Sequence, residues 1–189
     1  MDLADAIRQR VRLLSGAGGQ KRYLTHPLNG RFCPVDYDML DTLAGRLAAG
    51  IDAVNVDCVL GFPEGGTIPA YAVGRALDRP VLMGSRLPID EPDTITFEQP
   101  QAGLGTTHRV YGLRPGTRVI IVEDELTNGG MAVNAVRALR GAGVRIDHVA
   151  TLLAIDHPLL WRRMAAEGLT LHVGVRLSPE QASRPLEAG

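Results

Sequence analysis

Two adjacent carboxylates, Glu123 and Asp124, stand between a run of four apolar residues and a short loop that carries Gly129 and Gly130. Carboxylates bind sugar hydroxyls or a metal ion. The backbone N–H groups of a glycine-rich loop at a helix N-terminus bind phosphate instead. We therefore expect two kinds of contact side by side: phosphate at the loop, and sugar hydroxyls, a metal ion or both at the acids.

A strand and a helix would position these groups. Residues 119–122 are β-branched and apolar, which predicts a buried parallel strand. Further along the chain, Ala132, Val133, Val136 and Leu139 are spaced for one face of a helix. The acids would then lie at the carboxyl end of a strand, where open α/β sheets bind their ligands. An ordinary strand-to-helix turn with solvated acids is the alternative.

Two well-known phosphate-binding patterns do not fit this segment. A P-loop places a lysine directly after its last glycine, and Lys21 is the only lysine of the chain. A dinucleotide-binding fingerprint places its glycines first and its acid about 20 residues later, whereas here the acids precede the glycines.

A second loop, residues 62–66, lies between another apolar strand and another helix. Pro69 falls in the first turn of that helix, where its missing N–H is harmless. Residues 79–83 supply the next strand, so the segment is predicted to form a βαβ unit. Taken alone, it is equally well explained as a plain strand-to-helix loop.

Together these segments resemble the phosphoribosyl pyrophosphate (PRPP) motif and pyrophosphate loop of type I phosphoribosyltransferases. The resemblance covers roughly residues 22–175 and is greatest to the adenine and xanthine branch. It implies that Glu123 and Asp124 hold the ribose hydroxyls, that residues 127–131 hold the 5-phosphate, and that the backbone of residues 62–67 binds pyrophosphate. It also implies a Mg²⁺ cofactor, with Asp124 as a candidate ligand, and a homodimer.

Residue by residue, the resemblance assigns four sets of positions. The expected PRPP-binding residues are Glu123, Asp124, Thr127, Asn128, Gly129, Gly130, Met131, Glu64, Gly65, Gly66, Arg86 and His108. The expected catalytic residues are Glu123, Asp124, Glu98 and Arg109. The expected base-binding residues are Thr25, His26, Asp156 and His157.

The sequence departs from the family pattern at three positions. Asn128 stands where Thr is commoner, and Met131 stands where many members have a hydroxyl. After residues 80–83, Arg86 is the one candidate cation where the family often has an Arg-Lys pair. Residues 87–113 form a long connection that matches the family's mobile arm. In that arm, His108 and Arg109 are the candidates to assist the leaving diphosphate, although solvated loop residues are the simpler explanation for each.

Two segments, residues 22–34 and 155–175, correspond to the hood that covers the base in the family. Both differ from the xanthine pattern, because Thr25 replaces an Asn and residues 155–157 replace an acid–lysine pair. Changes at hydrogen-bonding positions alter specificity strongly. A purine is the favoured acceptor, with a modified heterocycle as the alternative. Trp161 is more simply explained as a core residue.

Alternating strands and helices predict a single α/β domain, an open, mainly parallel sheet with helices on both faces, and the family resemblance adds a small hood. Global properties are compatible with this fold. The chain has 189 residues, 45% hydrophobic residues and a net charge of −1, which argues against a general nucleic-acid binder. No apolar run approaches 18 residues, and neither a secretory signal nor a disulfide framework is evident, so a cytoplasmic protein is expected. Helices are expected at residues 2–14, 36–49 and 158–167, an irregular segment at 23–34, and strands near 56–61, 80–83, 118–123, 147–154 and 170–175.

The leading hypothesis is transfer of the phosphoribosyl group of PRPP to a nitrogen of a heterocyclic base, with release of pyrophosphate. A PRPP-sensing protein of the same fold without turnover is the second hypothesis. A third is an acid–metal hydrolase that uses Glu123, Asp124 and Glu125. Glu125 is expected to point away from Asp124, since successive side chains of a strand alternate.

Overall fold

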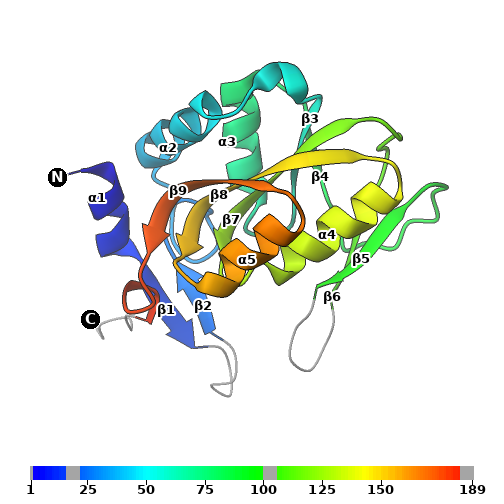
Figure 1. The fold of residues 1–189 in the computed structure, drawn as a ribbon. Coiled ribbons are helices and arrows are strands. Elements are labelled where there is room, and N and C mark those ends of the chain that lie inside the picture. Colours follow the sequence, from blue (N-terminus) through cyan, green and yellow to red (C-terminus); the bar gives the residue numbers. More distant parts are fainter. Residues whose placement is uncertain (1, 16–21, 100–105, 184–189) are drawn as a thin grey trace.

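The computed structural model describes residues 2–15, 22–99 and 106–183, and its centre is a sheet of five parallel strands (Figure 1). The strand order is β4-β3-β7-β8-β9. Their bounds are Val81–Met83 for β4, Cys58–Gly61 for β3, Arg118–Leu126 for β7, Arg145–Ile155 for β8 and Thr170–Leu177 for β9. The predicted parallel sheet is confirmed, and β7, which carries the two acids, is its middle strand.

Helices cover both faces of the sheet, as predicted. On one face lie α1 (Leu3–Arg10), α2 (Tyr37–Ala49) and α3 (Thr67–Leu77), and on the other lie α4 (Gly130–Gly141) and α5 (Pro158–Ala166). Alternate residues of β7 pack into two separate cores. Ile120 and Val122 join the core under α2 and α3, and Ile121 joins the core under α4. This alternation explains why the strand is apolar at every position before its acids.

The N-terminal region differs from the prediction. The helix expected at residues 2–14 ends at Arg10, and the chain continues as β1 (Arg12–Ser15), which pairs antiparallel with β2 (Arg22–Thr25). The irregular segment expected at 23–34 therefore begins as a strand. Antiparallel pairing with the nearby strand β2 outweighs the local helical preference of residues 12–14. Asp36, the expected N-cap of α2, accepts a hydrogen bond from the N–H of Met39.

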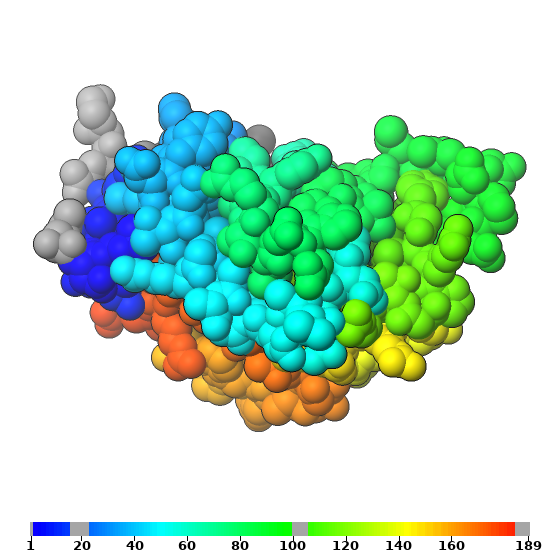
Figure 2. Space-filling model, turned by 90° about the horizontal axis from the view of Figure 1, so that it is seen from above, coloured from blue at the N-terminus to red at the C-terminus, as the bar shows by residue number. Residues whose placement is uncertain are grey.

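The connection expected to be irregular, residues 87–113, contains a hairpin of β5 (Ile95–Gln99) and β6 (Thr106–Val110). Residues 100–105 lie outside the described part of the chain. The hairpin projects from one end of the molecule (Figures 1 and 2). Its inward side chains, among them Phe97 and Val110, join the core beneath α4. The described residues also form two short 3₁₀ helices, Ala53–Asn55 and Gln181–Ser183. None of the described helices combines the length and hydropathy needed to span a bilayer.

Candidate active site

A cavity of about 400 Å³ opens at the carboxyl ends of β3 and β7. The segment around β2, the loop after β3, the end of β7 with its following loop and the start of α4 supply most of its lining, and Arg86 after β4, Gln99 of β5 and Arg163 of α5 complete it. The lining residues are Tyr23, Arg31, Phe62, Pro63, Glu64, Gly65, Arg86, Gln99, Glu123, Asp124, Glu125, Leu126, Thr127, Asn128, Gly129, Gly130, Met131 and Arg163. Parallel strands end at the same edge, which is why the two predicted loops meet here.

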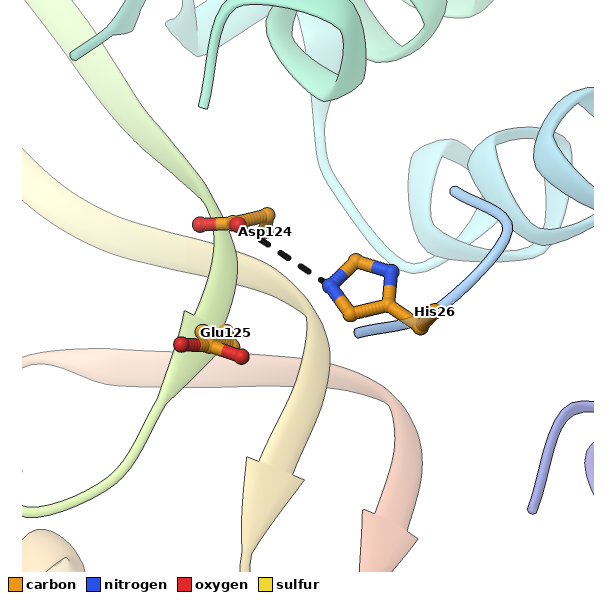
Figure 3. A group of neighbouring side chains, drawn as sticks. All are labelled: His26, Asp124 and Glu125. Carbon is orange, nitrogen blue, oxygen red and sulfur yellow. Dashed lines mark ion pairs between the residues drawn. The ribbon is translucent and has the colours of Figure 1, made fainter. Parts of the chain in front are cut away.

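The two predicted acids are held deep in this cavity. Glu123 is 4% exposed and Asp124 is 5% exposed. The side-chain amide of Asn29 donates a hydrogen bond of 2.6 Å to Oδ2 of Asp124, and Nε2 of His26 lies 3.9 Å from the same oxygen (Figure 3). A buried carboxylate needs such partners, because an unpaired buried charge is costly. Asp124 is therefore fixed in place by the segment that follows β2.

The expectation that Glu125 points away from Asp124 is wrong. Ligand atoms of His26, Asp124 and Glu125 all lie within 4.8 Å of one another, and Glu125 lines the same cavity (Figure 3). Strand alternation fixes the direction of the Cα–Cβ bond. The carboxylate of Glu125 is separated from this bond by rotatable side-chain bonds. Rotation about them lets the carboxylate reach the cavity although the Cα–Cβ bond points to the opposite side of the strand.

Burial governs the ionisation of these groups. It raises the pKa of Glu123 well above its ordinary range, and the neighbouring charges of Asp124 and Glu125 raise it further. The pKa of Glu125 rises to about 8 for the same reasons, burial first and then Asp124. Burial lowers the pKa of His26 to about 4, against the opposing attraction of Asp124. At neutral pH the imidazole is thus uncharged, and a cation entering the cavity would favour the ionised forms of both glutamates.

The donor set of this cavity fits a hard divalent cation. Carboxylate oxygens of Asp124 and Glu125 lie within reach of a common point, and Oε2 of Glu125 is buried without a hydrogen-bond partner in the described residues. Mg²⁺ prefers such oxygen ligands, and imidazole is better suited to Zn²⁺. The carboxylates, rather than His26, are therefore the groups that would hold Mg²⁺.

The loop after β3 packs against Asp124. A Cβ atom added to Gly65 would lie 2.6 Å from Oδ1 of Asp124 and closer still to Oδ2, so no side chain fits at this position. The peptide bond between Pro63 and Glu64 is cis. The carboxylate of Glu64 lies between two cations, 3.4 Å from Nη1 of Arg86 and 3.8 Å from Nε of Arg31. Two arginines thus converge on one carboxylate at the predicted pyrophosphate loop.

The loop after β7 has the backbone geometry of a phosphate site. Gly129 has φ of 73°, a left-handed conformation that favours glycine, and α4 begins at the next residue. The N–H of Gly130 donates to Oδ1 of Asn128, and no side chain caps the helix from Gly129. Free N–H groups at a helix N-terminus attract an anion. Met131 lines the cavity beside them.

Tyr23 and Arg31 form part of the cavity wall, and Phe32 packs beside them outside the cavity lining. The guanidinium carbon of Arg31 lies 4.9 Å from the ring centre of Phe32 and 5.8 Å from that of Tyr23. Nε of Arg31 is buried and donates no hydrogen bond within the described residues. A planar ring could stack on such a wall while accepting a hydrogen bond from Arg31.

Three residues of the predicted arm lie outside the cavity. His108 is fully buried, stacks on Phe97 and bonds to Gln99, so it does not line the cavity in which it was expected to meet PRPP. Burial lowers the pKa of His108, and the nearby charge of Arg86 lowers it further, so this position disfavours a positively charged imidazole. Strand alternation in β6 places His108 inward and leaves Arg109 to contact the backbone of Arg86. Glu98 accepts a hydrogen bond from Thr107. Gln99 is the residue of the described hairpin that reaches the cavity.

The residues expected to bind the base are also placed differently. Thr25 is buried against Cys33, and His26 supports Asp124 from behind. Asp156 accepts a hydrogen bond from the Trp161 indole, and His157 caps the start of α5. None of these side chains lines the described cavity. Trp161 is not simply a core residue, because the guanidinium of Arg176 covers its ring at 4.3 Å.

Several residues in or beside the site were not predicted from the sequence, Gln99 of the hairpin among them. Asn29, Arg31 and Phe32 lie in an irregular segment, and Arg163 lies on α5, about 35 residues beyond the motif. The sequence around them has no spacing pattern linking them to the acids. The signal that was available is the position of Asn29 and Arg31 within the expected hood.

The chain was compared with known proteins. No family model matches it. It is 28% identical over 162 residues to an orotate phosphoribosyltransferase of Methanocorpusculum labreanum, covering 86% of this chain and 84% of the relative. It is 32% identical over 158 residues to an orotate phosphoribosyltransferase of Sphingopyxis alaskensis, covering 79% and 69%. Its fold matches an adenine phosphoribosyltransferase structure from Rhodothermus marinus with a TM-score of 0.75 and 18% identity, covering 93% of this chain and 98% of that one.

Proposed function

This chain belongs to the type I phosphoribosyltransferase family, and we propose that it transfers the 5-phosphoribosyl group of PRPP to a ring nitrogen of a heterocyclic base, releasing pyrophosphate. One observation carries the proposal. A single cavity brings together two buried acids, a loop with free N–H groups at a helix N-terminus, and a second loop flanked by two arginines. These groups match the three parts of PRPP: the ribose hydroxyls, the 5-phosphate and the diphosphate.

The reaction breaks the bond between C1 of the ribose and a diphosphate oxygen and forms a bond from C1 to the base nitrogen. Positive charge develops on the ribose ring, next to Asp124, and negative charge develops on the leaving diphosphate. The N–H groups of the loop containing Gly65 and the guanidinium groups of Arg86 and Arg31 would stabilise that negative charge. Arg31 supplies the second cation that is missing after Arg86.

We assign Mg²⁺ to Asp124 and Glu125, whose carboxylates converge in the cavity. When bound, the ion would neutralise charge on the diphosphate. The protein's own contribution is to orient the ribose through Asp124 and Glu123 and to exclude water. We propose that the arm, residues 87–113, closes over the cavity for this purpose. The position of Gln99 in the cavity wall supports that role.

The acceptor would stack near Phe32 and Tyr23 and take a hydrogen bond from Nε of Arg31. A ring with an exocyclic oxygen fits this donor, and a purine remains the favoured acceptor. The curated relatives named above act on orotate, and the structural neighbour acts on adenine, so the acceptor differs among similar proteins. A panel of bases is therefore the appropriate test.

The test is release of pyrophosphate from PRPP, measured with Mg²⁺ and each of adenine, hypoxanthine, guanine, xanthine, uracil and orotate. Base-dependent release that is lost in Asp124→Asn supports the proposal. PRPP binding without release with any base would favour the PRPP-sensing alternative, which the methionine at position 131 and the absence of a lysine after Arg86 keep open.

We also propose a homodimer in the cytoplasm. Several large apolar side chains are exposed on the α2–α3 side and on the segment after β4: Tyr37, Val54, Tyr71, Leu87 and Ile89. Figure 2 shows these segments, coloured light blue to green, gathered on one face. An exposed apolar surface of this kind is typical of a protein interface. A monomeric mass by light scattering at micromolar concentration, with full activity, would contradict the dimer.

A further inference from the structure

The start of α4 contains an arrangement of donors that involves Arg163 of α5. The N–H of Gly130 and Nη1 of Arg163 converge on one acceptor atom, Oδ1 of Asn128, at 2.9 and 2.8 Å. Nη1 also donates to the backbone carbonyl of Asn128 at 2.9 Å. All three residues line the cavity. An oxygen atom held by a helix N-terminal N–H and a guanidinium group is in the environment that proteins offer to a phosphate oxygen.

Arg163 has further donors to offer. No carboxylate forms an ion pair with it in the part of the chain that the structure describes, and both of its hydrogen bonds come from Nη1. Its Nε–H and Nη2–H groups are therefore available to an incoming oxyanion. A guanidinium without an acidic partner beside free helix N-terminal N–H groups favours a dianionic ligand at this point.

The loop itself is short of one donor. Met131 has a thioether, which cannot donate a hydrogen bond. We propose that Arg163 binds the 5-phosphate of PRPP and compensates for the missing side-chain donor at position 131. The side-chain oxygen of Asn128 occupies the position of a phosphate oxygen until the substrate displaces it. This inference rests on the proposed function, because it assumes that a phosphorylated ribose enters the cavity.

The experiment compares two ligands that report on different halves of the cavity. Ribose 5-phosphate and pyrophosphate are titrated by calorimetry into the wild type, Arg163→Met, Arg163→Lys and Arg86→Met. Arg162→Met is the matched control, since Arg162 is an exposed neighbour on the same helix. The Arg163→Met variant loses a charged hydrogen bond to the phosphate. Its affinity for ribose 5-phosphate should therefore be about ten- to a hundredfold lower than that of the wild type. Pyrophosphate binding should change less than about twofold.

Arg86→Met should show the opposite pattern, and Arg163→Lys should retain part of the affinity, because lysine keeps the charge without the fork of donors. In steady-state kinetics, Arg163→Met should raise KM for PRPP more than it lowers kcat.

Two results would overturn the inference while leaving the proposed function intact. One is wild-type affinity of Arg163→Met for ribose 5-phosphate. The other is equal weakening for both ligands, which would indicate that Arg163 merely braces the loop. If neither ligand binds the wild type, the proposed function fails together with the inference.

Discussion

Replacing Gly65 by alanine tests whether the loop after β3 sets the position of Asp124. The added Cβ would lie 2.6 Å from Oδ1 and closer still to Oδ2 and Cγ of Asp124. An ordinary non-bonded contact needs about 3.5 Å. The carboxylate, or the loop, must therefore shift by about 1 Å or more, which would also strain the 2.6 Å hydrogen bond from Asn29.

A displacement of about 1 Å at a group that orients the substrate costs on the order of 100-fold in rate. We expect Gly65→Ala to lower kcat/KM for PRPP by about that factor, measured as initial rates of pyrophosphate release. The matched control is Gly45→Ala on α2, where an added Cβ meets nothing within 4 Å. This control should keep full activity and gain up to about 1 kcal/mol of stability, because alanine favours a helix.

The melting temperature separates the two causes of a rate loss. A Gly65→Ala protein that folds cooperatively and loses activity supports the close contact with Asp124. Wild-type kcat/KM in this variant would refute the reasoning, because it would mean that the carboxylate position does not matter or that the loop yields without consequence.

Three further changes follow from the same structure. Asp124→Asn should leave the circular dichroism spectrum unchanged, lower kcat about 100- to 1000-fold and weaken PRPP binding, because it removes charge next to the cationic ribose; activity near the wild-type level would exclude Asp124 as a ribose-binding acid. Asn29→Ala removes the donor to buried Asp124, so urea unfolding should show a loss of about 1–3 kcal/mol, and an unchanged midpoint would contradict the role of this hydrogen bond. The carboxylate of Asp57 accepts hydrogen bonds from Arg118, and these bonds lower the pKa of Asp57 to about 2. A lowered folded-state pKa stabilises the protein above the unfolded value of about 4 and loses that contribution as pH falls from about 4 to 2. Wild-type melting temperature should therefore fall more steeply than that of Asp57→Asn across this range, and parallel curves would show that the pair does not contribute.

The central sheet and the phosphate loop could be predicted because their signals are local. An apolar run that ends in Glu123 and Asp124, followed by Gly129 and a helical pattern, identifies one strand–loop–helix unit within about 20 residues. The structure places this unit in the middle of the sheet, and the predictions of fold class, family and phosphoribosyl transfer are confirmed. Here local preference and tertiary packing agree.

The rest of the candidate site depends on contacts between segments that are distant in the sequence. No repeating pattern of residues indicates such contacts. Asn29 meets Asp124 across 95 residues, and Arg163 meets Asn128 across 35. The direction of the Glu125 carboxylate depends on side-chain torsions that alternation does not determine. The burial of His108 could not be predicted because the hairpin itself was not. On the inner side of β6, the imidazole ring stacks on Phe97 as another aromatic ring would.

The division of the described chain into three separate sheets limits how acceptor specificity can change. Tyr23, Arg31 and Phe32, which we propose as the contact surface for the acceptor, belong to or follow the small β1–β2 sheet, outside the five-stranded sheet that carries the acids. Evolution or design could exchange Tyr23 and Phe32 while the phosphoribosyl-binding half stays unchanged, whereas Arg31 also lies beside Glu64 and Asp124 and would have to be kept.

The same short segment also carries His26 and Asn29, which reach across to Asp124. A graft of the whole segment from another enzyme would therefore alter the ribose site along with the base. Single substitutions among the proposed acceptor-contacting residues would therefore be the way to change the acceptor, while His26 and Asn29 are kept because they position Asp124.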